Sequence, residues 1–189
     1  MQPRLCCGNP CKGFTLTELL TASAILGIFV SMAWGTLLLI LEAENKQDAE
    51  FERQQELNRA VDFIADDVHS ASQLSTVVTL PGPEDGLFEL VYPDGSKTAY
   101  FVVPKEARRW RGPYLLLRRS SSMSQPQPLV DGLSDRSPLC TSPPGEVVQA
   151  SGVKVVLQGQ GYLQVCLAGL LPDNQLWSAS RQVMVRGGS

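Results

Sequence analysis

Hydrophobic residues are distributed unevenly along this chain of 189 residues. Residues 19–41 form a run of 23 without a charged side chain, whereas charges are frequent from Glu42 onward. As an α-helix rising about 1.5 Å per residue, this run would span roughly 35 Å, enough for a hydrocarbon core of about 30 Å. The pattern therefore predicts a membrane-spanning helix near the N-terminus.

A second helical pattern follows the first without a break. Residues 42–72 contain neither proline nor glycine, and their apolar residues recur at helical spacing, so that they form one face. These apolar positions are Leu57, Ala60, Val61, Ile64, Ala65, Val68 and Ala71. We expect the helix to continue past the membrane and to pack this face on a globular head, residues 73–189.

After residue 80 the hydrophobic pattern changes from that of a helix to one typical of β-strands. Residues 87–92 and 97–103 are rich in β-branched and aromatic side chains and flank the turn signal Pro93-Asp94-Gly95, which predicts a hairpin. Further strands are expected at 112–119, 153–158, 161–169 and 181–185. Together these elements predict an α+β fold, with a mainly antiparallel sheet against a helix.

Charge sets the orientation of the predicted span. Arg4 and Lys12 precede it with no acidic residue before Glu18, and the segment after residue 41 is mostly acidic. Positive charge is retained in the cytoplasm, so we expect a single-pass protein of the inner (cytoplasmic) membrane with a periplasmic or extracytoplasmic head. A cleaved secretory signal is disfavoured, because its apolar region would be only about 7–15 residues long and no convincing cleavage site follows residue 41.

Two of the five cysteines lie in the part expected to be exported. An even pair in an oxidising compartment suggests a disulfide between Cys140 and Cys166, with two free thiols as the alternative. The bond would tether residues 120–145, a serine- and proline-rich segment that we expect to be one long surface loop with no strand. A zinc site from the three N-terminal cysteines and His69 is disfavoured by its spacing and by the membrane between them.

The segment KGFTLTELL, residues 12–20, resembles the processing and methylation motif of type IV pilins and type II secretion pseudopilins. That motif has a short basic leader ending in glycine, then phenylalanine, a run of small and apolar residues, and a glutamate four places after the phenylalanine. All of these stand directly before a span of the right length. Many major pilins carry a proline in the middle of this helix. Residues 27–35 contain none, which hints at a minor component.

The resemblance implies that prepilin peptidase cuts between Gly13 and Phe14 and that Phe14 becomes N-methylated. Residues 1–13 would be the leader and residues 14–41 the transmembrane and assembly helix of a pilin-like lollipop fold. Glu18 would pair with the N-terminal amine of a neighbouring subunit, because an ammonium makes a carboxylate tolerable in the membrane. The alternative for Glu18 is interfacial placement, with its carboxylate reaching the headgroups.

Two further stretches carry likenesses within the family. Residues 57–71 resemble the helix segment of J-type pseudopilins and W-type minor pilins, in which apolar residues are followed by acidic, apolar, basic and small ones. Residues 42–71 as a whole resemble pilin-like proteins of cyanobacterial polysaccharide-secretion systems. These likenesses imply a minor subunit.

One basic cluster contains an aromatic residue: Arg108, Arg109, Trp110 and Arg111. It is a candidate patch for an anionic ligand, such as phosphates or an anionic polysaccharide, and a solvated edge of the sheet is the alternative. Without Arg4 and Lys12 the chain keeps 14 basic and 19 acidic residues, a net charge of −5. We therefore do not expect nucleic acid as a general partner.

Chemistry-bearing motifs are otherwise absent from the sequence. The single histidine, His69, has no positioned serine partner, and there is no nucleophile-elbow or phosphate-binding pattern. No EF-hand spacing appears among the aspartates. We expect no enzymatic activity, no metal and no cofactor.

These observations favour a minor pilin or pseudopilin that assembles into a filament or its tip and supports secretion or motility. Its partners would be the lipid bilayer, prepilin peptidase, other pilin-like subunits and an inner-membrane assembly platform, as the resemblance implies. The alternative is a membrane-anchored extracytoplasmic binding domain that never assembles.

Overall fold

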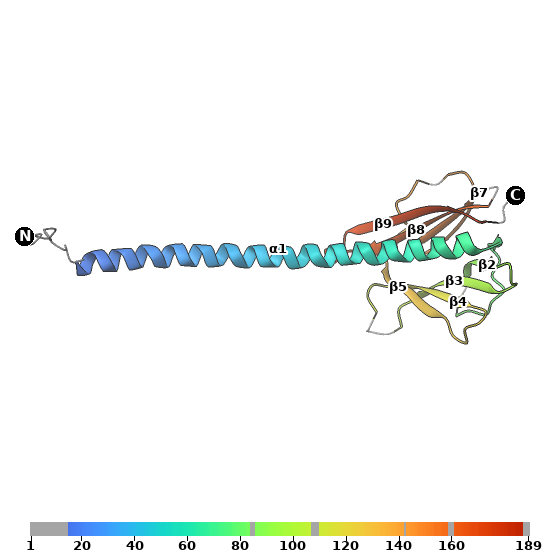
Figure 1. Ribbon diagram of the computed structural model, residues 1–189, viewed down its shortest axis with the longest axis horizontal. Coiled ribbons are helices and arrows are strands. Elements are labelled where there is room, and N and C mark those ends of the chain that lie inside the picture. Colours follow the sequence, from blue (N-terminus) through green and yellow to red (C-terminus); the bar gives the residue numbers. More distant parts are fainter. Residues whose placement is uncertain (1–14, 84–85, 107–109, 142, 159–160, 187–189) are drawn as a thin grey trace, which may run out of the picture. The chain divides into compact units, whose positions relative to one another are not determined.

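The computed structural model describes residues 15–83, 86–106, 110–141, 143–158 and 161–186. Within these residues the chain forms one long helix, α1 (Leu16–Ser70), followed by nine strands (Figure 1). By its internal contacts the chain divides into two units, Met1–Lys46 and Gln47–Ser189. The second unit contains the end of α1 and all the strands.

In the first unit, α1 is a regular helix with every side chain exposed. Its few hydroxyl groups turn back onto the helix. Thr21 Oγ1 donates to the carbonyl oxygen of Thr17 at 3.0 Å, and Ser31 Oγ donates to that of Ile28 at 2.8 Å. Such bonds satisfy polar side chains internally, as an apolar environment requires.

In the second unit, one face of α1 is buried. It consists of Arg53, Leu57, Ala60, Val61, Ile64, Ala65 and Val68. Six of these seven side chains belong to the apolar face predicted from the sequence. The seventh, Arg53, is a charged side chain that is only 2% exposed.

The nine strands of the described residues form one antiparallel sheet with the order β1-β2-β3-β4-β5-β8-β7-β6, and β9 pairs with the other edge of β8. They are β1 (Gln73–Ser75), β2 (Gly86–Val91), β3 (Lys97–Pro104), β4 (Tyr114–Ser120), β5 (Gln127–Leu133), β6 (Glu146–Ala150), β7 (Val153–Gln158), β8 (Tyr162–Leu170) and β9 (Leu176–Met184).

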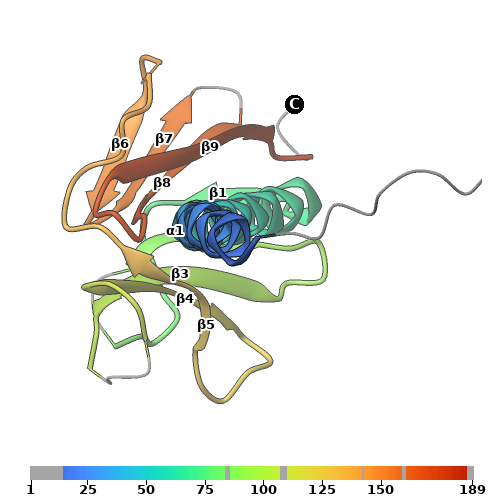
Figure 2. The same cartoon turned by 90° about the vertical axis from the view of Figure 1, so that its left-hand side faces the viewer.

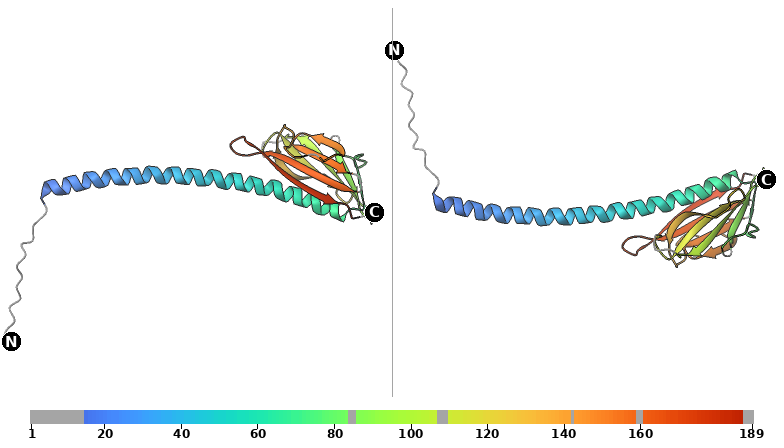
Figure 3. Two further views of the ribbon diagram at one scale, coloured as in Figure 1. Left: turned by 90° about the horizontal axis from the view of Figure 1, so that it is seen from above. Right: turned by 90° about the horizontal axis from the view of Figure 1, so that it is seen from below.

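This sheet curls around the C-terminal part of α1. Figure 2 shows the helix between β3, β4 and β5 on one side and β7, β8 and β9 on the other, and Figure 3 shows the strands lying along the green part of the helix. Both groups of strands contribute to one apolar core with α1, for example Tyr100 and Val102 from β3 and Val165 and Leu167 from β8. The result is the predicted pilin-like α+β fold, a long N-terminal helix packed against an antiparallel sheet.

Most of the strands lie where the sequence predicts them, but three do not. The expectation that residues 120–145 form one loop is wrong, because β5 lies inside this segment and pairs with both β4 and β8. Pro128 and Gly132 are residues that disfavour a strand assignment from sequence alone. The pairing of β5 with β4 accommodates them through register shifts. The short strand β1 and the edge strand β6 were also not predicted, and β9 begins earlier than expected, at Leu176.

Candidate processing and assembly site

The described part of the chain begins at the start of α1, where Thr15 and Glu18 bind each other. The Thr15 N–H donates to Glu18 Oε2 at 3.0 Å, and the Thr15 hydroxyl donates to the same oxygen at 2.9 Å. The Glu18 N–H in turn points to Thr15 Oγ1 at 3.4 Å. This reciprocal arrangement is a capping box, which stabilises a helix N-terminus. The T-x-x-E spacing of Thr15 and Glu18 is the sequence signal of this cap.

The capping box has a consequence for the predicted role of Glu18. Its carboxylate lies at the positive end of the helix dipole and already has local donors. Local capping is therefore one role of a glutamate at this position, and its pairing with another subunit stays a prediction. Gly13 and Phe14, the predicted cleavage and methylation residues, lie outside the described residues.

The apolar part of α1 after Glu18 has the properties of a membrane span. An 18-residue window has a mean hydropathy of 2.3, and none of it is buried within the protein. A helix in the core of a soluble protein would be mostly buried. Length, composition and exposure therefore indicate an anchor in the membrane.

An ion-pair network around the buried Arg53, absent from the sequence predictions, fastens α1 to the head. The Arg53 guanidinium lies 2.7 Å from a Glu56 carboxylate oxygen and 3.3 Å from Asp131 Oδ1, and it donates to the Asp131 carbonyl oxygen. The other carboxylate oxygen of Asp131 accepts the N–H of Arg111 at 2.8 Å. Charges that are paired in this way are tolerated in a protein interior.

A second polar contact fastens the same helix near its end. Asp67 accepts hydrogen bonds from the Tyr100 hydroxyl at 2.5 Å and from Arg118 Nε at 2.6 Å. Burial raises the pKa of Tyr100 well above its ordinary value, and the adjacent carboxylate raises it further. Burial disfavours the Arg118 cation, but Asp67 outweighs this effect and raises the Arg118 pKa. Tyr100 therefore remains a neutral donor and Arg118 a cation at any ordinary pH.

The basic cluster is only partly visible, because Arg108 and Arg109 lie outside the described residues. Arg111 is exposed and lies 3.9 Å from Glu56. The two later arginines of the region are also engaged: Arg118 with Asp67, and Arg119 with the carbonyl oxygen of Pro81 at 2.5 Å. An anion would have to compete with these partners, and the predicted anionic-ligand patch remains a prediction.

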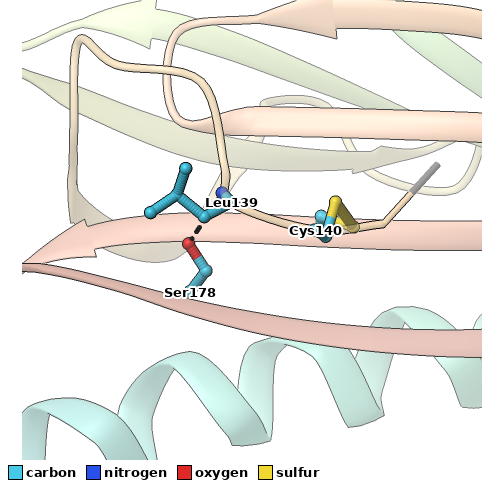
Figure 4. The surroundings of a disulfide bond; sticks show 4 residues. Leu139, Cys140 and Ser178 are labelled. Atoms are coloured by element: carbon cyan, nitrogen blue, oxygen red, sulfur yellow. Dashed lines mark hydrogen bonds between the residues drawn. A yellow bond between two sulfur atoms is a disulfide. The ribbon is translucent and has the colours of Figure 1, made fainter.

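In the structure, Cys140 and Cys166 are joined by a disulfide with their Cα atoms 6.5 Å apart (Figure 4). Cys166 is fully buried in β8, and Cys140 lies in the segment after β5. The neighbouring Leu139 N–H donates to the hydroxyl of Ser178 on β9 at 3.1 Å. The two attachments hold this segment across β8 and β9.

Among the described residues, no group of three or more His, Cys, Asp or Glu side chains is placed to hold a metal ion. The single histidine, His69, is exposed near the end of α1. The polar clusters that the structure does describe, around Arg53, Asp67 and Glu89, each join two parts of the head. Their geometry is that of structural contacts.

Comparison with known families identifies one segment of the chain. Residues 8–34 match the prokaryotic N-terminal methylation motif. No curated protein and no solved structure gives a significant match. The matched segment includes Gly13, Phe14 and Glu18 and runs into the apolar part of α1.

The chain thus combines a prepilin-type N-terminus with a pilin-like α+β fold. Proteins with this motif are typically structural subunits and not enzymes. The motif implies processing by prepilin peptidase and pilus assembly partners in general. Together with the exposed apolar helix, it indicates anchoring in the inner membrane.

Proposed function

We propose that this protein is a minor pilin or pseudopilin subunit, assembled into a type IV pilus-like or secretion filament or its tip. The methylation motif at residues 8–34 is the observation that carries the proposal, because it leads directly into an exposed apolar helix. The cytoplasmic N-terminus and exported head rest on the positive charge before the span. The subunit would support secretion of protein or polysaccharide, or motility.

In this proposal Glu18 has two successive roles. Before assembly it caps its own helix through Thr15. After cleavage, the methylated amine of Phe14 on a neighbouring subunit neutralises its charge within the apolar bundle. The pair fixes the axial register of the two helices, because any other register leaves a carboxylate unpaired in the membrane.

Helix packing along the span would complete the assembly. Small residues recur at every fourth position of α1, and beyond the helix's own backbone there is open space around the two glycines among them: Ser23, Gly27, Ser31 and Gly35. Small residues at this spacing allow helices to approach closely in a bilayer. The stripe supports the proposal that α1 packs against similar helices.

The N-terminal mass of the protein recovered from its native membrane tests the proposal. We expect a chain that begins at N-methylated Phe14. A chain that retains residues 1–13 in the presence of active prepilin peptidase would be inconsistent with a pilin. The anchored binding domain would then be the better account.

Two variants separate the roles of Glu18. Glu18→Gln keeps a capping side chain but removes the charge, because glutamine also serves in a capping box. Thr15→Val removes the hydroxyl of the cap but keeps the charge. We expect Glu18→Gln to be cleaved normally and to be lost from the sheared filament fraction, while Thr15→Val still assembles. The reverse pattern would mean that capping alone explains Glu18.

A further inference from the structure

Strand β9 lies at an edge of the sheet along its whole length. It pairs with β8 through nine residues without a register shift, and its other side pairs with no strand among the described residues. It contains no proline or glycine and a single charge, Arg181, which is directed to Asp62 of α1 at 3.4 Å. Folded proteins usually protect such an edge, because its unpaired backbone groups can bind another chain.

The other two strands at the ends of the sheet are protected in the usual ways. Strand β1 is only three residues long. Strand β6 has five residues and begins directly after Pro143, Pro144 and Gly145. Short strands and neighbouring prolines both limit pairing with another chain. The long, regular edge of β9 is therefore the exception in this sheet, which indicates that a partner covers it.

The pairing register shows which backbone groups this edge presents. The Val185 N–H donates to the Gly161 carbonyl oxygen at 2.9 Å, and the Leu171 N–H donates to that of Gln175 at 3.0 Å. Both bonds belong to the uninterrupted register of β8 and β9, in which bonded and non-bonded pairs alternate. From residue 178 onward, the N–H and C=O groups of the even-numbered residues therefore point away from β8: Ser178, Ser180, Gln182 and Met184.

The last three of these residues form an open stretch of the edge. Ser180, Gln182 and Met184 are exposed, and no backbone hydrogen bond from another described residue reaches their outward groups. At Ser178, by contrast, the segment after β5 crosses the strand through the bond from the Leu139 N–H. The open stretch presents N–H donors and C=O acceptors at every second residue. An extended peptide matches this spacing and can add a strand to the sheet.

The position of β9 beside α1 indicates where such a peptide comes from. The turn before β9 lies near Glu52, and Val185 after it lies near Ser72, so β9 follows α1 in the same direction. Figures 1 and 2 show the strand alongside the helix. A neighbouring subunit whose helix packs parallel to α1 is held next to this edge. Its effective concentration there is therefore high.

A different subunit fits this edge better than a second copy of the chain. Antiparallel pairing of β9 with β9 would relate two copies by a two-fold axis. Because β9 follows α1 in direction, the two α1 helices would then run in opposite directions, whereas subunits anchored in one membrane with the same orientation have parallel helices. A minor subunit also has other subunits as its neighbours.

The charge beside the edge suggests one property of the partner segment. Asp62 is already paired with Arg181, and Asp66 is exposed one helical turn further along the same face of α1. A strand added to β9 directs every second side chain toward this part of the helix. A lysine or arginine at one of those positions would complement Asp66 and help to set the register.

We propose that β9 is a docking edge at which an extended segment of a different, neighbouring pilin-like subunit adds a strand to the sheet. The outward backbone groups of Ser180, Gln182 and Met184 bind this segment, and a basic side chain of the segment faces Asp66. The inference rests on the proposed function, since it names the part of the head by which assembled subunits meet.

Two substitutions at one position test the backbone contact. Gln182→Pro removes an N–H that points away from β8, whereas Gln182→Ala keeps this N–H and shortens only the side chain. With photoreactive benzoylphenylalanine at position 180 of the full chain in its native membrane, we expect an adduct with a different protein that carries the same N-terminal methylation motif. Gln182→Pro should lower the adduct yield about tenfold or more, because it leaves a carbonyl of the partner unpaired. Gln182→Ala should leave the yield unchanged.

Thermal unfolding of the variants in detergent shows whether the head stays folded. Both Gln182 variants should unfold at the temperature of the parent protein, since a proline is tolerated where the N–H of an edge strand faces away from the sheet. Arg181→Pro removes an N–H that is bound to β8 and should lower this temperature.

Hydrogen exchange tests the same contact without a substitution, so it does not depend on the stability of the proline variant. The N–H groups of Ser180, Gln182 and Met184 should exchange rapidly in the isolated full chain and slowly in the sheared filament fraction. The N–H of Arg181 is bound to β8 and should be protected in both samples. Rapid exchange of the three outward groups in the filament fraction would contradict strand addition.

The proposal is overturned by no adduct from position 180, by an adduct with a second copy or with a protein that lacks the motif, or by equal yields from the two Gln182 variants. The N-terminal mass of the same sample separates this failure from failure of the proposed function. N-methylated Phe14 without the expected adduct rejects docking at β9 alone. A retained leader rejects the assembly on which the docking depends.

Discussion

Glu89 is a charged residue in the apolar interior of the head. It is 2% exposed and lies in β2 among buried apolar neighbours. Its carboxylate accepts the N–H groups of Thr79 and Leu80 at 2.7 and 2.9 Å, and it pairs with Lys97 at 2.9 Å. The interactions hold the segment before β2 against the sheet. A buried carboxylate with this many donors is a structural anchor.

The same contacts make the stability of the head depend on pH. Burial raises the pKa of Glu89, but the hydrogen bonds from Lys97, Thr79 and Leu80 outweigh it and leave the pKa below its ordinary value. The folded state therefore binds the Glu89 proton more weakly than the unfolded state. The stabilisation is complete above the unfolded pKa of about 4.3 and is lost as pH falls through the folded value.

We expect Glu89→Gln to lower the free energy of unfolding by about 2–4 kcal/mol at pH 7, because it leaves Lys97 and two N–H groups without their carboxylate. The variant should also lose less stability than the parent protein between pH 5 and about pH 3. Urea denaturation of the full chain in detergent measures both effects. Glu146→Gln, at an exposed position of β6, is the control and should change neither. Equal pH dependence in parent and variant would contradict the role of Glu89.

At the scale of elements, strands β2 and β8 are covered on one face by α1 and on the other face by a loop segment. The segment before β2 binds Glu89, and the segment after β5 is fastened to β8 by the disulfide. As a result, β2 and β8 are buried on both faces. Apart from Glu89 in β2 and Gln164 in β8, their sequences accordingly consist mostly of apolar residues and do not alternate between apolar and polar positions.

Strand β5 depends on a glycine at its contact with α1. Gly132 has φ of +62°, and a Cβ at this position would collide with the Arg53 guanidinium. Gly95 in the β2–β3 turn has φ of +81° but open space around it. Both glycines therefore have a positive φ, but only Gly132 is packed against another side chain.

We expect Gly132→Ala to destabilise the head by at least about 2 kcal/mol more than Gly95→Ala. A side chain in the left-handed region costs about 1–2 kcal/mol in both variants, and only Gly132→Ala also displaces the buried Arg53 from its ion pairs. Thermal or urea unfolding of the two full-length variants gives the difference. Equal losses would show that Arg53 can move aside at little cost.

At the scale of the whole head, two groups of strands meet at very few backbone pairs. Strand β5 pairs with β8 at Leu133 and Gly169, and the N–H of Ser134, directly after β5, donates to the Ala168 carbonyl oxygen at 2.9 Å. The connection therefore relies on the shared core around α1 and on the disulfide that links the segment after β5 to the middle of β8.

We expect the Cys140→Ala, Cys166→Ala double variant to be about 3 kcal/mol less stable than the oxidised parent. The two cysteines are 26 residues apart, and closing a loop of this size contributes about this much in the chain-entropy model. Unfolding with and without a reductant measures it, and the reductant should not affect the double variant. A parent protein indifferent to reductant would mean that the bond contributes nothing.

Much of this protein follows from local sequence. The uncharged run of residues 19–41 determines the apolar half of α1, and the spacing from Leu57 to Val68 determines the face that the head covers. In both patterns the polarity of each residue indicates directly whether it lies in an apolar environment or in water. The motif around Gly13, Phe14 and Glu18 is likewise readable without a structure, because its chemistry depends on neighbours in the chain.

Only the tertiary structure decided the rest, because it depends on residues far apart in sequence. Arg53 looks like a solvated helix residue until Asp131, 78 positions away, is placed beside it. Strand β5 looks like a loop, since its pairing and not its composition makes it a strand. The sequence determined which elements form and where the apolar helix lies. The buried charges and the surfaces that adjoining loops expose were decided by the packing of those elements.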